Sequence, residues 1–141
     1  MKKFILIIVL LMTIPLLLGM GSLQGSAPAE KIPIPAKNYR AIFVDQMDVI
    51  TECTHISIEG STFLEGKRGE GNYTISFDNI DQVLFRLNLE RLTAIVKLHS
   101  GGTNELILNK NHRAFGRTTY GTFQIRLVDL KKLTIEASSQ K

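Results

Sequence analysis

Apolar and polar residues alternate in short stretches along most of the chain after residue 38, which is the pattern of β-strands with one buried face. One such stretch covers residues 73–77, stops at Asp78-Asn79, and resumes at residues 83–87. Proline cannot donate a backbone hydrogen bond to a sheet, and none occurs after Pro35. The pattern therefore predicts a body made mostly of strands joined by short turns.

The same pattern occurs twice. Residues 66–85 match residues 116–135 at a constant offset of 50 and without a gap, and half of the 20 positions are identical or chemically similar. The matches are mainly glycines and apolar residues, among them Gly66 with Gly116, Gly71 with Gly121, Tyr73 with Phe123, Ile75 with Ile125, Phe77 with Leu127, Val83 with Leu133 and Phe85 with Ile135. In each copy the two glycines bracket a turn, where a positive φ or a close backbone approach favours glycine. We interpret the match as an internal duplication.

A further strand pair precedes each copy. In the second half, Thr93–Leu98 and Glu105–Leu108 are joined through Ser100–Thr103, which contains a Gly-Gly turn signal. In the first half the counterparts are Tyr39–Val44 and Ile50–Ile58. Together these segments predict an all-β fold, a small antiparallel sandwich or partly closed barrel of about eight strands, built from two sequence-related halves that share one core.

Residues 78–87 also fit an amphipathic helix, with Asp78 as the N-cap and the apolar residues on one face. The second copy of this segment, residues 129–135, is short and ends in the β-branched residues Thr134 and Ile135. Because β-branched residues favour strands, we expect a strand in both copies.

Residues 1–29 have the features of a cleavable export signal: two lysines, an apolar stretch at residues 4–18, and small residues ending in Ala27-Pro28-Ala29. The stretch has 15 residues, fewer than the ~20 that usually span a membrane. We expect cleavage after Ala29, or alternatively near Gly19–Gly21, and a periplasmic or extracellular protein. The alternative is an uncleaved segment that anchors the chain to the inner membrane, the one case in which we expect a membrane partner.

The expected organisation after the signal is a proline-containing extended linker at residues 30–38, a single β domain at 39–137, and a polar tail at 138–141. Without residues 1–29 the chain keeps 15 lysines and arginines against 13 acids, a net charge of +2. A charge this small, together with export, argues against a nucleic-acid partner.

Charge is unevenly distributed along the chain. Residues 45–90 carry nine acids and three bases, a net of −6, and residues 91–141 carry nine bases and three acids, a net of +6. If the two halves present separate faces, the molecule is dipolar, and its basic face suits an anionic polymer or an acidic protein. If they interleave around one core, the charges roughly cancel.

The second half contains the glycine and apolar positions Phe115-Gly116, Tyr120-Gly121, Phe123, Ile125, Leu127, Leu130 and Leu133. This pattern resembles small β-rich modules of exported bacterial proteins, over about fifty residues of the second copy and more loosely over residues 66–85. The resemblance implies a β fold and an envelope location. Such modules share no catalytic motif that maps onto this chain, so the resemblance implies no site residues.

The sequence contains no nucleophile motif, phosphate-binding loop or Cys-x-x-Cys pair, so we predict no catalytic residues and no cofactor. Cys53 is the only cysteine, and its strand-like surroundings predict a buried, unreactive thiol. On a regular strand Cys53 and His55 leave the same face, which is the only arrangement resembling a metal pair. Two ligands do not define a site without His99 or His112 nearby, and we predict no metal.

A basic segment in the second half is the candidate binding site. It is expected to be an exposed loop containing Lys110, His112, Arg113 and Arg117. We therefore expect an exported, non-catalytic envelope module that binds a protein partner or an anionic surface polymer. The alternatives are an envelope enzyme with an unrecognised carboxylate or His/Cys site, which would show as a deep cleft, and a structural or self-associating domain.

Overall fold

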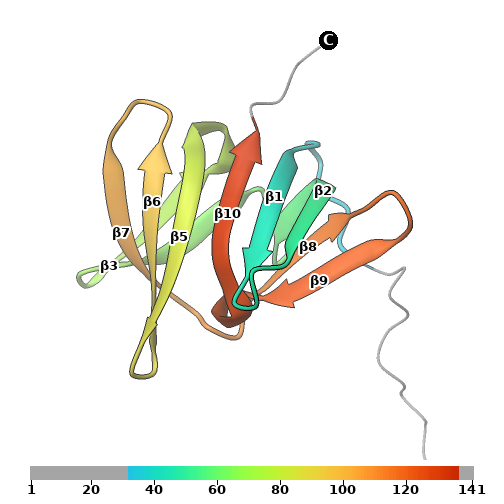
Figure 1. The fold of residues 1–141 in the computed structure, drawn as a ribbon. Coiled ribbons are helices and arrows are strands. Elements are labelled where there is room, and N and C mark those ends of the chain that lie inside the picture. Colours follow the sequence, from blue (N-terminus) through green and yellow to red (C-terminus); the bar gives the residue numbers. More distant parts are fainter. Residues whose placement is uncertain (1–31, 137–141) are drawn as a thin grey trace, which may run out of the picture.

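The computed structural model describes residues 32–136, which form an all-β fold in a single antiparallel sheet (Figure 1). The expected export signal, residues 1–29, and the polar tail, 138–141, lie outside the described residues. The strands are β1 (Arg40–Asp45), β2 (Ile50–Ile58), β3 (Phe63–Arg68), β4 (Gly71–Ser76), β5 (Ile80–Asn88), β6 (Arg91–Leu98), β7 (Thr103–Leu108), β8 (Arg113–Arg117), β9 (Thr122–Arg126) and β10 (Leu130–Glu136). Two 3₁₀ turns, η2 (Phe77–Asn79) and η3 (Leu127–Asp129), precede β5 and β10.

The order of the strands across the sheet has a two-fold pattern. It runs β4-β3-β7-β6-β5-β10-β1-β2-β8-β9, so that the first five strands mirror the last five about the contact between β5 and β10. The β1–β2 hairpin lies between β10 and β8, and the β6–β7 hairpin lies between β5 and β3. In the half of the sheet that contains β3, β4 and β5, the remaining hairpin, β6–β7, comes from the second half of the sequence. In the half that contains β8, β9 and β10, the remaining hairpin, β1–β2, comes from the first half of the sequence.

The ten strands correct the expected number of about eight, because β3 and β8 were interpreted as hairpin-tip and loop segments. Their inward positions explain the error: β3 turns Leu64 and Gly66 inward, and β8 turns Ala114 and Gly116 inward. A strand whose inward residues include glycine and alanine has little apolar alternation in its sequence. The sequence pattern therefore shows the glycines but does not indicate the strands that contain them.

The segments after the turns are strands in both copies, and the helix considered for residues 78–87 is wrong. In each copy a strand ends in a 3₁₀ turn whose first residue, Phe77 or Leu127, is buried, and the following strand pairs antiparallel with its neighbours. The expected bends at Asp78-Asn79 and Val128-Asp129 are confirmed in these turns. No helix long enough and apolar enough to cross a membrane occurs among residues 32–136.

The core is one cluster to which both sequence halves contribute. Phe43 of β1 packs against Phe123 of β9 with ring centroids 5.4 Å apart, and Tyr39 meets Phe77 edge-on at 5.5 Å. Leu130 and Leu133 of β10 are almost fully buried beside them. Because the exchanged hairpins place residues of both halves in the same cluster, the two halves bury their apolar faces against each other.

The described part of the expected linker packs against the sheet. Ile32 and Pro35 are buried, and Lys37 forms an ion pair with Asp78 at the start of η2. Tyr39 donates a hydrogen bond to the same carboxylate oxygen, 2.8 Å away. These two donors, first Lys37 and then Tyr39, lower the pKa of Asp78 below its usual value of 3.8. The segment before β1 is therefore attached to the turn that introduces β5.

The sheet interleaves the acidic and basic parts of the chain. β2 and β3 belong to the acidic residues 45–90 and lie beside β8 and β7 of the basic residues 91–136. Ion pairs connect the two sets, Lys97 with Asp81 and Lys131 with Asp48. Of the two charge arrangements considered, the described residues adopt the interleaved one, so the molecule has no separate acidic and basic halves.

Candidate functional site

The four predicted basic-site residues do not form one patch, because strand β8 separates them. Lys110 and His112 lie in the turn before β8, Arg113 begins that strand and Arg117 ends it. The backbone N–H of Arg113 donates to Glu59 Oε1 at 2.6 Å, and that of His112 to the carbonyl of Asn109. Lys110 lines an open groove, whereas Arg117 lines a separate small pocket.

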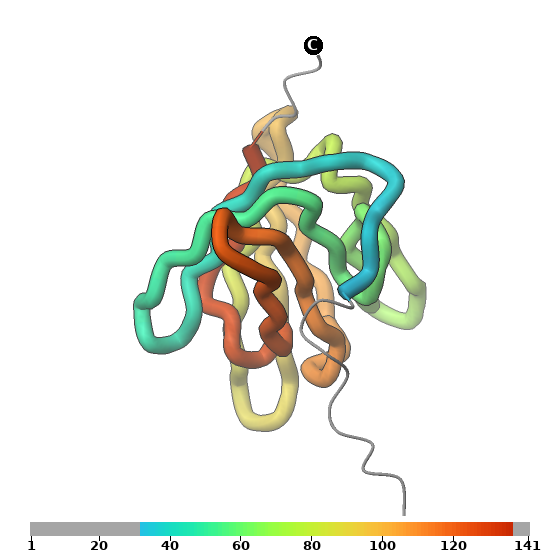
Figure 2. Tube along the Cα trace, turned by 90° about the vertical axis from the view of Figure 1, so that its right-hand side faces the viewer, coloured from blue at the N-terminus to red at the C-terminus, as the bar shows by residue number. Residues whose placement is uncertain are grey.

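The groove that contains Lys110 lies at the end of the molecule where three turns meet. It has a volume of about 1170 Å³ and lies between the β5–β6 turn, the β7–β8 turn, η3 and the residue Gln46 of the β1–β2 turn. All three turns lie toward the lower end of the molecule in Figure 1, and in Figure 2 the β1–β2 turn projects to the left of the other two. We call this site the turn-end groove and this end of the molecule the turn end.

The turn-end groove is lined by more cations than anions: Arg86, Lys110, Arg126 and Lys131 against Glu90 and Asp129. Arg126 pairs with Asp129 at 3.0 Å, and Lys131 pairs with Asp48. Arg86 and Lys110 form no ion pair with another residue of the described range. Of the four cations that line the groove, these two are therefore the ones that are not held in an ion pair.

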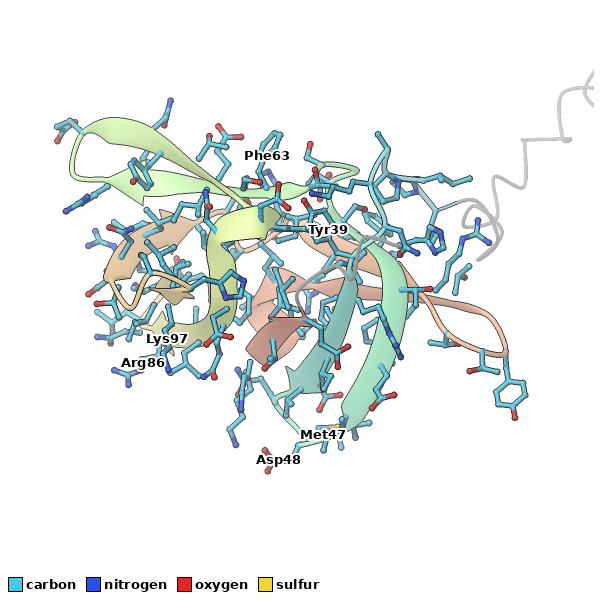
Figure 3. All side chains as sticks on the ribbon, turned by 90° about the horizontal axis from the view of Figure 1, so that it is seen from above. Tyr39, Met47, Asp48, Phe63, Arg86 and Lys97 are labelled. Carbon is cyan, nitrogen blue, oxygen red and sulfur yellow. The ribbon has the colours of Figure 1, made fainter. Side chains whose placement is uncertain are left out.

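The turn between β1 and β2 is held in place by its own hydrogen bonds and by η3. Asp45 Oδ1 accepts from the backbone N–H groups of Met47 and Val49, at 2.8 and 3.0 Å. Gln46 donates through its backbone to Asp129 and through its side chain to the carbonyl of Leu130, 2.8 Å away. Met47 and Asp48 consequently project outward from an ordered turn (Figure 3).

The turn between β5 and β6 has an unusual backbone for its sequence. Asn88 pairs with Arg91, and Leu89 between them has a φ of +56°. This left-handed conformation favours glycine, asparagine and aspartate, and it costs a leucine roughly 1–2 kcal/mol. The Leu89 side chain is also 92% exposed, so no burial in the described structure offsets that cost. An exposed apolar residue in a strained turn is a candidate for a function outside the fold.

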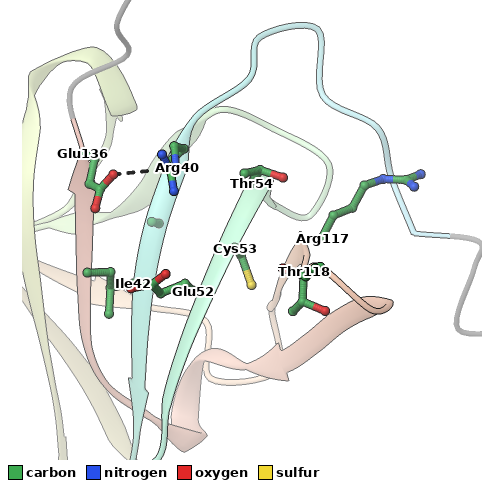
Figure 4. A pocket seen from close by; sticks show the side chains of 10 residues that line it. Arg40, Ile42, Glu52, Cys53, Thr54, Arg117, Thr118 and Glu136 are labelled. Carbon is green, nitrogen blue, oxygen red and sulfur yellow. Dashed lines mark ion pairs between the residues drawn. The ribbon is translucent and has the colours of Figure 1, made fainter.

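A second, smaller pocket of about 200 Å³ lies over β1, β2 and the end of β8 (Figure 4). Arg40 and Glu136 form an ion pair across its rim, 3.8 Å apart, and the Cys53 side chain points toward Thr118. Cys53 is buried, as predicted, and burial raises the pKa of its thiol to about 11. A protonated, enclosed thiol is a poor nucleophile and a poor metal ligand.

The histidines are dispersed over the fold. Strand β2 is irregular at His55, which has a φ of +51°, and the pairing of β2 with β8 shifts between Thr54 and Ser57. The same-face arrangement expected for Cys53 and His55 depends on a regular strand, and β2 is not regular at His55. His99 lies at the end of β6, where its backbone N–H donates to Asn79. Residues 32–136 contain no group of three histidine, cysteine or acidic side chains placed to hold a metal ion.

The apolar side chains of the turn end are not among the residues that the sequence predicts for a site. Five of the nine exposed large apolar residues in the described chain lie on two hairpin turns or on the strand residues next to them, namely Met47, Val49, Ile50, Leu87 and Leu89. A signal was present, because the β5–β6 turn reads Leu-Asn-Leu-Glu-Arg-Leu where turn residues are usually polar or glycine. The alternation of apolar and polar residues predicts which side of a strand is buried. It does not show where a strand projects beyond its neighbours, so that its apolar residues are exposed.

The chain belongs to a protein family described as "Uncharacterised protein", whose model matches residues 35–138. The match begins in the segment packed before β1 and includes all ten strands. No curated protein and no solved structure matches the chain. The functional proposals below therefore depend on the residues and geometry of this chain.

Proposed function

We propose that this protein is an exported, non-catalytic binding module of the cell envelope that binds an anionic partner in the turn-end groove. The observation that carries the proposal is the pair of cations Arg86 and Lys110, which line a groove of about 1170 Å³ and form no ion pair within the described residues. The signal-like pattern of residues 1–29 supports export. The enclosed, protonated thiol of Cys53 and the dispersed histidines favour binding over catalysis.

A groove of this kind suits a flexible anion better than a small, rigid ligand. Its walls are two hairpin turns, the connection between β7 and β8, and η3, and its cations extend from separate elements. A chain of phosphates or carboxylates can contact several of these cations in succession, and each contact is screened by salt. We therefore expect modest affinity that falls as ionic strength rises.

Titration of a soluble polyanion tests the proposal. Fluorescently labelled polyphosphate or polyglutamate is added to the chain beginning at Glu30, and binding is followed by anisotropy at low and physiological salt. Reversal of both groove charges, in the variant Arg86→Glu with Lys110→Glu, is expected to weaken binding by about tenfold at low salt.

The matched control is a double reversal outside the groove, Arg113→Glu with Arg117→Glu. These residues lie on β8 and belonged to the predicted basic loop, but neither lines the turn-end groove. Equal losses in both variants would indicate nonspecific charge attraction, and a loss only in the control would place the site along β8. Either result would contradict the groove as the binding site.

We also infer that the two halves arose by duplication of a five-strand unit. The matched segments 66–85 and 116–135 contain the same succession of strand, turn, strand, 3₁₀ turn and strand. The hairpins that precede them, β1–β2 and β6–β7, occupy equivalent places in the sheet order. A unit that gives its hairpin to a second copy would have begun as an exchanged dimer, whose fusion yields the present order.

A further inference from the structure

We propose that the anionic partner is a lipid bilayer, and that the protein docks on it with the β1–β2 and β5–β6 turns inserted between the headgroups. The inference rests on the proposed function, since the same cations supply the attraction for anionic lipid. It adds a second kind of contact, in which the exposed apolar residues of the two turns, Met47, Val49, Ile50, Leu87 and Leu89, enter the acyl region.

The exposed apolar residues are concentrated at two hairpin tips and the strand residues beside them. Leu89 is 92% and Met47 is 85% exposed, and each lies at the tip of its hairpin. β10 pairs with β5 only from Gln82 to Leu84, so the part of β5 after Leu84 extends beyond β10 toward the tip while it remains paired with β6 (Figure 1). Two projecting apolar tips beside a cationic groove match the two layers of a bilayer surface, acyl chains beneath anionic headgroups.

The tips are also organised before any partner arrives. The Asp45 hydrogen bonds and the attachment of Gln46 to η3 hold Met47 outward. The β5–β6 turn holds Leu89 in the left-handed conformation, where an asparagine would be less strained. Apolar side chains presented on ordered turns lose little conformational freedom on insertion, which favours binding.

The charges at this end favour anionic over neutral lipid. Arg86, Arg91 and Lys110 have no ion-pair partner in residues 32–136, and the one acid of the β5–β6 turn is Glu90. Asp48 lies beside Met47, where Lys131 neutralises it. Phosphate headgroups can therefore approach the groove without meeting an equal density of carboxylates.

Vesicle binding tests the proposal with the chain beginning at Glu30. It excludes the apolar residues 4–18, which would themselves enter a membrane, and it retains every strand and core residue. Co-sedimentation is measured with vesicles of phosphatidylglycerol and phosphatidylcholine, and with phosphatidylcholine alone. We expect binding to the anionic vesicles and a loss of about tenfold in the partition coefficient for Leu89→Asn.

Two controls make the result specific. Tyr120→Asn removes another fully exposed apolar side chain, on the β8–β9 turn outside the groove, and is expected to leave binding unchanged. The Leu89→Asn variant relieves the strained backbone, so its denaturation midpoint should rise, and loss of binding then cannot come from unfolding.

A fluorescence measurement tests insertion of the tip directly. The emission of an environment-sensitive dye attached at Leu89→Cys should shift to the blue on anionic vesicles. The same dye at Ser100→Cys, in the β6–β7 turn at the opposite end, should not shift.

The outcomes separate this inference from the proposed function. Retained polyanion binding without vesicle binding would overturn bilayer docking and leave a soluble polymer or an acidic protein as the partner. If reversal of Arg86 and Lys110 leaves both polyanion binding and vesicle binding unchanged, both proposals are overturned. Leu89-dependent dimers in sedimentation velocity would show that a second copy covers the tips, which also overturns docking on lipid.

Discussion

Two equivalent glycines allow neighbouring strands to pack closely in the two halves of the sheet. A Cβ on Gly116 of β8 would lie 2.6 Å from Cys53 Cβ and 2.9 Å from Sγ, on the adjacent strand β2. A Cβ on Gly66 of β3 would lie 2.8 Å from Leu106 Cβ on β7 and 3.0 Å from the carbonyl oxygen of Ile107. Glycine at these two matched positions therefore allows close approach of the strands and is not needed for a positive φ.

We predict that Gly116→Ala lowers the free energy of unfolding by about 1–3 kcal/mol, because the added methyl group overlaps a buried side chain on a neighbouring strand. Urea denaturation followed by circular dichroism measures the change. Gly121→Ala is the matched control, since its added Cβ would meet nothing within 4 Å and its φ is outside the left-handed region. Equal stability of Gly116→Ala and wild type would show that β2 and β8 separate easily, contrary to the packing described.

At the scale of single elements, the contact between the N-terminal segment and η2 depends on the charge of Asp78. Lys37 and Tyr39 both donate to Asp78 Oδ1 and lower the pKa of this carboxyl below 3.8. A lowered pKa means that the folded state holds the carboxylate more strongly than the unfolded chain does. The stabilisation is thus complete above the unfolded pKa and is lost as the pH falls through the lower folded value.

We predict that Asp78→Asn lowers the denaturation midpoint at pH 7 and that its difference from wild type shrinks steadily below pH 3.8. Denaturant titrations between pH 7 and pH 2.5 measure both quantities. Asp81→Asn is the control, because its carboxylate contacts Lys97 only at 3.9 Å and should change the midpoint less. A difference that stays constant across this pH range would mean that Asp78 acts through packing and not through its charge.

The sequence predicted those elements whose inward side chains are large and missed those whose inward side chains are small. Strands β5, β6 and β10 show clear alternation because Val, Phe and Leu occupy their buried positions. β3 and β8 were missed because glycine fills an inward position in each. For the candidate site, the sequence predicts one exposed loop that contains Lys110, His112, Arg113 and Arg117. The structure places Lys110 and His112 in the turn before β8, whereas Arg113 and Arg117 belong to that strand. The turn-end groove joins turns distant in sequence, and only the strand order brings them together.

At the scale of the whole molecule, stability depends on contacts between the two sequence halves. Five of the nine neighbouring strand pairs connect strands β1–β5 with strands β6–β10, namely β3 with β7, β5 with β6, β5 with β10, β1 with β10 and β2 with β8. The only strand pairs within the first half are the hairpins β1–β2 and β3–β4, and the only ones within the second half are the hairpins β6–β7 and β8–β9. Isolated two-stranded hairpins are at best marginally stable in water. Neither half can therefore complete a sheet by itself.

We predict that the fragments Glu30–Leu89 and Glu90–Lys141, divided at the β5–β6 turn, are each unfolded as monomers and regain the sheet when mixed. Their net charges are opposite: nine acids and six bases give −3, and four acids and nine bases give +5. Opposite charges speed association at low ionic strength, so the rate of reassembly should fall as salt is added. Stopped-flow circular dichroism after mixing measures that rate.

The stoichiometry of this experiment also tests the proposed duplication. Mass measurement by light scattering should give one copy of each fragment per folded complex, with the thermal transition appearing only in the mixture. A fragment that melts cooperatively as a monomer would contradict the exchange of hairpins seen in the strand order. A fragment that forms a folded homodimer at high concentration would instead reproduce the proposed ancestral dimer. In that dimer, each copy's hairpin would occupy the place in the sheet that the hairpin of the other sequence half occupies in the intact chain. The charge difference disfavours that dimer, because two identical fragments repel each other.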